Sequence, residues 1–260
     1  MPRPLDSRRP VSATAYLTAA LMGTTVSIDV RDEDVDRPAL VAAVEVLHDI
    51  DARFSTYRHD SEISRLDRGD LALDDASADV REVLDACARL KAESGGAFDA
   101  YRAGQLDPSG YVKGWAADRA ADSLRAAGAR NFALNLGGDI VCSGERGGGE
   151  PWRIGLRHPD DPARMMLVLG VRDGAVATSG LYERGAHVTD ARDGGAADAW
   201  RSLTIMASDL TTADSLATAA LARGTDGPAW AAARLGCDVA ALDSDDRLFT
   251  TPGISAARLA

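Results

Sequence analysis

Apolar side chains recur along the chain with two different spacings, one typical of helices and one typical of strands. In residues 38–54 they return every three or four positions, at Leu40, Val44 and Leu47, which predicts an amphipathic helix. Similar spacing predicts further helices from about residue 80 to Gly95-Gly96 and at residues 112–127, 212–223 and 228–235. Alternating or β-branched runs predict strands at residues 24–30, 131–136, 152–156, 166–171 and 202–207, with a closing hairpin at 239–242 and 247–250.

The order of these elements indicates the class of fold. Strands and helices are mixed without strict alternation and without internal repeats. We therefore expect an α+β fold, with mixed sheets and packed helices, rather than a doubly wound sheet. Residues 144–151 are rich in glycine and are the expected loop or hinge between two lobes, about 12–145 and 146–260, with an active cleft between them.

The start of the chain bears on where the protein works. Residues 1–11 carry three arginines and are expected to form a disordered tail. The stretch that follows lacks the apolar density of an export signal, although a poor export signal is the alternative. No run of about 18 apolar residues occurs, so we expect no membrane insertion and a cytoplasmic location.

Composition and charge limit the classes of partner. The 260 residues are 45% hydrophobic and 27% charged, which is ordinary for a globular protein. A net charge of -11 argues against a nucleic-acid surface, because such a surface needs cations to neutralise phosphates. Cys87, Cys142 and Cys237 lie far apart, which argues against a disulfide framework or a thiolate zinc site.

One candidate metal site lies at the start of a predicted helix. Asp214 and Thr218 are four residues apart, just over one turn, so their oxygens project from one face. Such a pair suits Mg²⁺, which takes few protein ligands and leaves room for water and substrate phosphate. The alternative is structural, with Thr211 as the N-cap, Asp214 at N3 and Thr218 bonded to its own backbone. The spacing alone favours this structural interpretation.

Other candidates are less specific on their own. Gly110 permits close approach of the backbone to a ligand. Lys113 lies near the start of a helix, against the preference of the dipole, which suggests an anionic ligand, although a solvated surface lysine is an equal alternative. Gly137-Gly138 follows a strand and is either a tight turn or a corner that admits a ligand. His187 has a side chain suited to accept a proton, although a structural role is the commoner one.

Several short blocks follow one another along the chain. They are Met22-Gly23-Thr24, Phe54-Ser55-Thr56-Tyr57, and residues 61–66, 96–99, 107–114 with 118–119, 136–140, 177–180, 187–190 and 213–218. In this order the blocks resemble the ApbE family, the FAD:protein FMN transferases. The resemblance covers residues 21–224, and the blocks together are more specific than any one motif.

The resemblance implies an ApbE-like fold and a reaction. Members of the family move the FMN moiety of FAD to a Thr or Ser hydroxyl of a target flavoprotein, forming a phosphoester and releasing AMP with the help of Mg²⁺. By this resemblance the FAD site is lined by Met22, Tyr57, Ala97, Phe98, Asp99, Asp107, Lys113 and Thr189. The metal would be held by the carbonyl of Gly110 with Asp214 and Thr218. His187 is the candidate base for the incoming hydroxyl, and Lys113 is the candidate charge on the diphosphate.

Two departures from the family pattern affect these expectations. Ala191-Arg192-Asp193-Gly194 stands where the family commonly has DPxTG, and Ala217 stands where many relatives carry a further carboxylate. The first departure is expected to loosen a turn near the proposed base. The second predicts a metal site that is mononuclear or weaker. Two other functions remain open for the same site: an Mg²⁺-dependent FAD pyrophosphatase that yields FMN and AMP, and an FAD-binding protein without catalysis.

Overall fold

The centre of the molecule is one large antiparallel sheet. The computed structural model describes residues 15–102, 104–180, 190–192 and 197–259. Every neighbouring pair of strands in this eight-stranded sheet runs antiparallel. In spatial order its strands are β1 (Ala15–Leu21), β2 (Thr24–Val30), β5 (Phe132–Leu136), β6 (Asp139–Ser143), β9 (Gly174–Gly180), β10 (Ser202–Ala207), β11 (Asp238–Leu242) and β12 (Leu248–Thr250).

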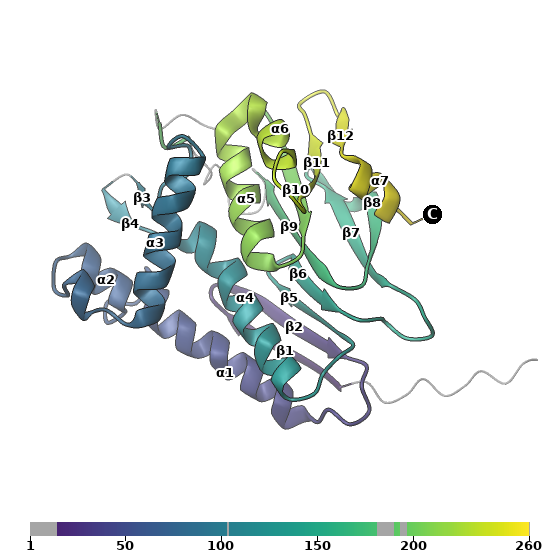
Figure 1. Cartoon of the computed structure of the whole chain (residues 1–260), viewed down its shortest axis with the longest axis horizontal. Helices are drawn as coiled ribbons and strands as arrows, with labels where there is room; N and C mark the ends of the chain where they lie inside the picture. Colours follow the sequence, from purple (N-terminus) through teal and green to yellow (C-terminus); the bar gives the residue numbers. More distant parts are fainter. Residues whose placement is uncertain (1–14, 103, 181–189, 193–196, 260) are drawn as a thin grey trace, which may run out of the picture.

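Helices cover one face of this sheet (Figure 1). The helices that pack on the sheet along much of their length are α1 (Arg37–Phe54), α4 (Ser109–Ala126) and α5 (Leu210–Arg223). Beside them lie α2 (Glu62–Asp67), α3 (Ala78–Glu93), α6 (Gly227–Ala232) and the short pair β3 (Tyr101–Arg102) and β4 (Gln105–Leu106). Within the described residues, none of the helices has the length and apolar character needed to cross a membrane.

A two-stranded hairpin covers part of the other face. It is formed by β7 (Trp152–His158) and β8 (Asp161–Val171), and α7 (Pro252–Ala257) packs beside it. The alternation of side chains along β6 serves both layers: Val141 belongs to the core under the helices, and Cys142 belongs to the core under the hairpin. The sheet is therefore buried on both faces where the hairpin covers it.

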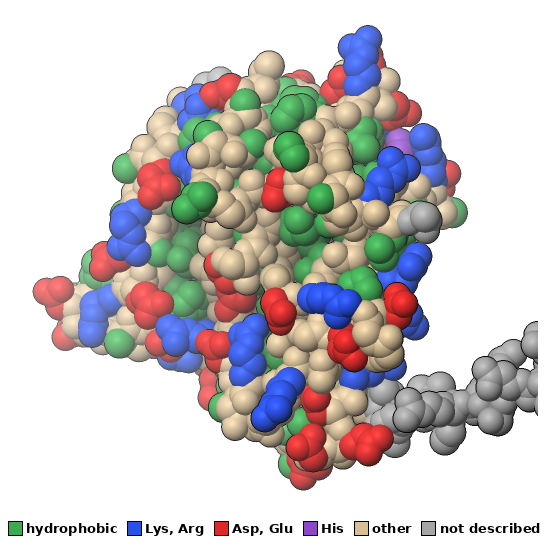
Figure 2. All heavy atoms as spheres, turned by 45° about the vertical axis from the view of Figure 1, so that its right-hand side comes forward, with side chains coloured by type: hydrophobic (Ala, Val, Ile, Leu, Met, Phe, Trp, Pro, Cys, Tyr) green, Lys and Arg blue, Asp and Glu red, His purple; other side chains and the backbone are tan. Residues whose placement is uncertain are grey.

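Acidic and basic side chains are interspersed on the face shown in Figure 2. The net charge of -11 is thus not gathered into one patch on this face. The cysteines are buried free thiols, in agreement with the absence of a disulfide framework expected from their spacing.

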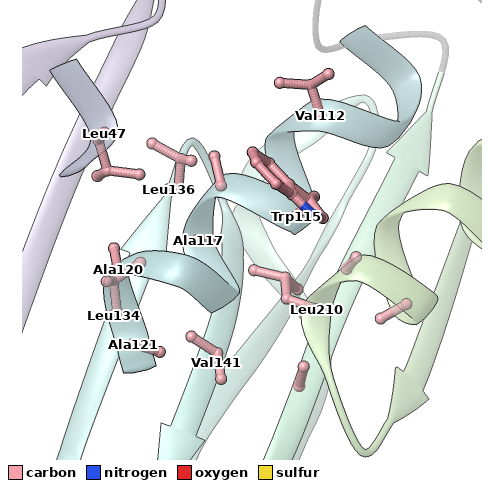
Figure 3. Close-up of a cluster of buried hydrophobic side chains, with 14 of the residues drawn as sticks. Leu47, Val112, Trp115, Ala117, Ala120, Ala121, Leu134, Leu136, Val141 and Leu210 are labelled. Carbon is pink, nitrogen blue, oxygen red and sulfur yellow. The ribbon is translucent and has the colours of Figure 1, made fainter. Parts of the chain in front are cut away.

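Small side chains let α4 lie close to the sheet. Ala117, Ala120 and Ala121 are fully buried and face the side chains of β5 and β6, such as Leu134 and Val141 (Figure 3). Because alanine adds little bulk, the helix backbone approaches the strands and also the neighbouring α5. This close packing places the start of α4 beside α5, where the candidate metal residues lie.

The α+β class is confirmed, and most predicted elements are present with their ends shifted by a few residues. Among the described α-helices and strands, seven were not predicted: β1, β6, β9, α2, α7 and the short pair β3 and β4. The Gly137-Gly138 pair forms the tight turn between β5 and β6, and both glycines have positive φ. The large sheet takes strands from both sides of residue 145, and β6 pairs directly with β9 across it. The division into two lobes stays a prediction, and residues 1–11 lie outside the described part of the chain.

Candidate functional site

A cavity of about 570 Å³ lies between the turn that joins β1 and β2, the end of α1 and the segment before β3. The start of α4, the end of β9 and the middle of α5 complete its lining. Ten of the twelve site residues expected from the sequence line it: Met22, Tyr57, Ala97, Phe98, Asp99, Asp107, Gly110, Lys113, Asp214 and Thr218. The other two, His187 and Thr189, lie outside the described residues. Residues that are distant in the sequence are thus gathered around one opening.

Charged side chains form the floor of this cavity. The Nζ atom of Lys113 lies 2.5 Å from Oδ2 of Asp139 and 3.4 Å from Oδ1 of Asp214. Both carboxylates are almost fully buried, at 1% and 2% exposure. Lys113 is therefore a paired lysine and not a solvated surface residue. Burial raises the pKa of Asp214 to about 7, although Lys113 acts to lower it, while the charge of Asp139 raises it further.

The contact between α4 and α5 fixes the carboxylate of Asp214. The backbone N–H of Gly114 donates to Oδ2 of Asp214 over 2.8 Å. A Cβ atom on Gly114 would lie 2.3 Å from the carbonyl oxygen of Leu210 and 2.9 Å from Cβ of Asp214. Only glycine therefore permits the two helices to come this close without a shift.

This geometry corrects the structural interpretation of Asp214. The N-cap of α5 is Asp209, whose side chain accepts from the N–H of Thr212, and not Thr211. Asp214 therefore lies beyond the first turn, and its carboxylate is turned toward α4. The sequence alone placed the N-cap two residues too late, because Asp209 and Thr211 both fit the same pattern of polar residues.

A hydroxyl pair lies one turn further along α5. Oγ1 of Thr218 and Oγ of Ser179, from β9, are 3.2 Å apart. A Cβ atom on Gly110 would come within 3.1 Å of Cγ2 of Thr218, so the backbone of α4 approaches Thr218 closely here. The sequence singled out Gly110 separately from the pair Asp214 and Thr218, and the fold brings all three to the lining of one cavity.

Another carboxylate, that of Asp118 on α4, binds the start of α5. Asp118 accepts hydrogen bonds from the N–H of Leu210 over 3.0 Å, from the N–H of Thr211 over 2.7 Å and from Oγ1 of Thr211 over 2.6 Å. Burial raises the pKa of Asp118, and these hydrogen bonds partly offset the effect. Together with Asp209, this carboxylate satisfies the free N–H groups at the helix start. It therefore fixes the helix that carries Asp214.

Ion pairs also orient the carboxylates at the cavity walls. Asp99 pairs with Lys91 of α3 over 2.5 Å, and Asp107 pairs with Arg102 over 3.2 Å. Burial opposes ionisation of Asp107, but hydrogen bonds from Ser109 and Arg102 outweigh it and hold the pKa of this carboxyl below its usual value.

The cavity has aromatic and apolar surface as well. Phe98 is 6% exposed, so its ring is buried in the cavity lining. Tyr57 is 95% exposed, so its ring faces solvent at the rim of the cavity. Met22 reaches the cavity from the turn between β1 and β2, where its φ of 53° is unusual for a residue other than glycine. These three side chains offer contacts to a flat, partly apolar ligand.

Several cavity residues were not predicted as site residues. Asp51, Arg58, Arg102 and Ser179 line the cavity, and Asp139 lies behind Lys113. The sequence signal for Asp139 was present, since it directly follows the Gly137-Gly138 turn. Its partner could not be read from spacing, because Lys113 is on a helix that precedes the strand and the pairing is formed by the tertiary fold.

The donor set beside α5 fits Mg²⁺. Asp214 offers a carboxylate, Thr218 a hydroxyl and Gly110 a nearby backbone carbonyl, and all of these are the hard oxygen ligands that Mg²⁺ takes. No cluster of three or more His, Cys, Asp or Glu side chains suited to a metal occurs among the described residues. A single-carboxylate site is the kind that relies on water and substrate oxygens for its remaining ligands.

Comparisons with known proteins agree in family and fold. The model of the ApbE family matches residues 22–104 and 100–241. A protein of Vibrio cholerae called FAD:protein FMN transferase is 32% identical over 131 residues, which are 46% of this chain and 39% of that protein. Its namesake in Rhodobacter capsulatus is 32% identical over 58% of this chain and 31% of its own length. The matched segments thus span well under half of these two relatives, whereas a namesake in Haemophilus influenzae is 24% identical over 81% of each chain.

Solved structures show the same fold. The flavin transferase ApbE from Vibrio cholerae superposes with a TM-score of 0.82 at 24% identity, over 94% of this chain and 99% of that one. The ApbE protein of Thermotoga maritima gives a TM-score of 0.83 at 21% identity, over 95% of this chain and 100% of that one.

Proposed function

The chain belongs to the ApbE family, and we propose that it transfers the FMN moiety of FAD to a Thr or Ser hydroxyl of a target flavoprotein, forming a phosphoester and releasing AMP. One observation carries the proposal. Ten residues chosen from sequence motifs, spread from Met22 to Thr218, line one cavity of about 570 Å³. Its floor combines a lysine and a buried carboxylate, and its walls add hydroxyl and aromatic groups, as a bound dinucleotide requires.

The side chains divide into binding and reacting groups. Phe98, Tyr57 and Met22 offer surfaces for the flat rings of FAD. Lys113 places a positive charge at the floor, where it would neutralise charge that develops on the diphosphate as the bond to AMP breaks. Asp214, Thr218 and the carbonyl of Gly110 would hold Mg²⁺, which supplies further charge neutralisation when bound.

The transfer itself exchanges one P–O bond for another. The acceptor hydroxyl oxygen forms a bond to the phosphorus on the FMN side, and the bond from that phosphorus to the AMP oxygen breaks. The hydroxyl proton has to leave as the oxygen attacks, and His187 is the residue proposed to accept it. No covalent bond to this chain is needed, so positioning and electrostatics are the contributions expected of the protein.

Mass spectrometry of the acceptor tests the proposal directly. A candidate flavoprotein incubated with this protein, FAD and Mg²⁺ should gain the mass of FMN less one water on a Thr or Ser. The Asp214→Asn variant should lose the transfer almost completely, whereas Asp32→Asn, at a carboxylate that binds the backbone of Arg130 and Asn131 instead, should keep it.

Two other results would give the site a different function. Rapid release of FMN and AMP from FAD at the same rate with and without acceptor would identify a pyrophosphatase. Stable binding of FAD with neither product, and with no effect of Mg²⁺, would identify a binding protein without catalysis.

A further inference from the structure

Asp139 is a buried carboxylate that the proposed transfer does not use. It is 1% exposed and lies at the start of β6, directly after the turn of Gly137 and Gly138. Its two oxygens have different partners. Oδ1 accepts from the backbone N–H of Thr178 over 2.9 Å, and Oδ2 faces the ammonium of Lys113 at 2.5 Å.

The position of Lys113 between two carboxylates has an electrostatic consequence. Its ammonium is 2.5 Å from Asp139 and 3.4 Å from Asp214, so the shorter contact is with the carboxylate that lies behind the cavity. An ammonium in direct contact with Asp214 would compete with any cation for the same oxygens, because both need its negative charge. A carboxylate on the far side of the ammonium reduces this competition.

We infer that Asp139 is a positioning residue that holds the ammonium of Lys113 away from Asp214 and thereby keeps the Asp214 carboxylate open to a divalent cation. The inference rests on the cation site of the proposed function. The backbone contact with Thr178 keeps the Asp139 carboxylate in place, so Oδ2 is aimed at Lys113 whether or not a ligand is bound. Asp214, at 3.4 Å, is the second carboxylate that forms an ion pair with Lys113, so it would attract the ammonium more strongly once the charge of Asp139 is removed.

A purely structural role for Asp139 predicts something different. In that case the carboxylate would only anchor the turn before β6 to β9 through Thr178. An asparagine keeps a carbonyl oxygen for this hydrogen bond and removes only the charge. Asp139→Asn therefore separates the anchoring of the turn from the pairing with Lys113.

Binding of Mn²⁺ to the full-length protein without FAD tests the inference. Free Mn²⁺ is measured by electron paramagnetic resonance, with Mg²⁺ as competitor. Asp139→Asn should weaken Mn²⁺ binding by about 10- to 100-fold, the range typical of residues that support metal ligands. Asp238→Asn is the matched control, because Asp238 also accepts a backbone N–H, that of Gly253, but lies outside the cavity. It should change the affinity by less than about threefold.

The Lys113→Gln background makes the test specific. If Asp139 acts through Lys113, the loss caused by Asp139→Asn should shrink to a few-fold once the lysine is absent. An equal loss in both backgrounds would overturn the inference, because it would mean that Asp139 acts on the cation directly through its charge. An unchanged affinity in Asp139→Asn would overturn it as well.

Lys113→Gln alone covers the case in which Asp139→Asn does not fold. With Asp139 in place, removal of the lysine should raise Mn²⁺ affinity only slightly. A gain in Mn²⁺ affinity above about tenfold would show that the ammonium of Lys113 already blocks the Asp214 carboxylate in the wild-type protein, which contradicts the inference. A wild-type protein that binds no Mn²⁺ would overturn the cation site and this inference together, whereas wild-type binding with unchanged variants would overturn the inference alone.

Discussion

At the scale of single residues, Asp214 contributes both to the packing of α4 against α5 and to the proposed cation site. It is buried beside one lysine and a second carboxylate, and burial raises its pKa to about 7. Between pH values of about 4 and about 7 the folded protein holds a proton that the unfolded chain has lost. Rising pH therefore lowers the free energy of unfolding in this window. A cation that needs the ionised carboxylate recovers this loss when it binds.

Cation binding should therefore depend on pH near neutrality. Below the pKa of Asp214, each fall of one pH unit should weaken Mn²⁺ binding by about tenfold, because a proton must leave the carboxyl before the cation binds. Titrations at several pH values between about 5.5 and about 8.5, at constant ionic strength, measure the slope. Affinity that is flat across this range would show that Asp214 is ionised throughout or is not a ligand.

A second residue-scale prediction concerns Met22. Its positive φ, with that of Gly23, is the backbone that a two-residue hairpin turn requires, and asparagine adopts it more readily than methionine. Met22→Asn should stabilise the fold by about 0.5–1 kcal/mol and yet weaken FAD binding, because the thioether leaves the cavity. Thermal unfolding and a fluorescence titration with FAD measure the two effects. Met165→Asn, at a half-exposed position on β8, should leave FAD binding unchanged.

What the sequence could predict at this scale depends on where a residue's partners lie. Asp214 and Thr218 share a helix face, so their spacing was enough to group them. Lys113 stood out because a cation is unfavourable near a helix start, but its pairing with Asp139 joins a helix to a strand. The spacing of residues along the sequence does not show a contact between two separate elements.

At the scale of elements, the start of α5 depends on a neighbouring helix. Asp118 of α4 accepts three hydrogen bonds from Leu210 and Thr211. Asp32 makes a closely matched set, also of three, with Arg130 and Asn131. The two carboxylates therefore allow a comparison in which the number of lost hydrogen bonds is equal.

Asp118→Ala and Asp32→Ala should each lower the free energy of unfolding by about 1–2 kcal/mol, because each leaves backbone N–H groups without their acceptor. Only Asp118→Ala should also weaken Mn²⁺ binding, since it loosens the helix that carries Asp214. Urea unfolding and Mn²⁺ titration of both variants provide the comparison. Equal cation affinities in the two variants would mean that Asp209 alone positions α5.

Two of the elements that were missed, β1 and α7, share a physical reason. The strand β1 consists mostly of alanine, leucine and threonine without clear alternation, and α7 has only six residues. Both depend on neighbours for their structure: β1 is paired along its length with β2, and α7 packs on the hairpin of β7 and β8. Local sequence preference is weak in such segments, and tertiary contacts decide their structure.

At the scale of the whole molecule, the sheet joins the two halves of the chain. Strands β6 and β9 pair across the glycine-rich segment at residues 144–151, and hydrophobic cores lie on both faces of the same sheet. A fold joined in this way should unfold as one unit. Two independent lobes, by contrast, should unfold in separate steps.

Trp152→Ala distinguishes these cases. Trp152 is 5% exposed in the core under the hairpin and lies outside the cavity, so its loss should lower the free energy of unfolding by about 3–5 kcal/mol. In a single cooperative fold, the whole urea transition shifts to lower urea concentration, whether it is followed by circular dichroism or by loss of FAD binding. The folded protein keeps its affinity for FAD in the absence of urea. Leu235→Ala, at a fully exposed leucine, should shift neither signal. If Trp152→Ala shifted only part of the transition and left the FAD-binding part in place, the hairpin side would be a separate unit and the lobes would be real.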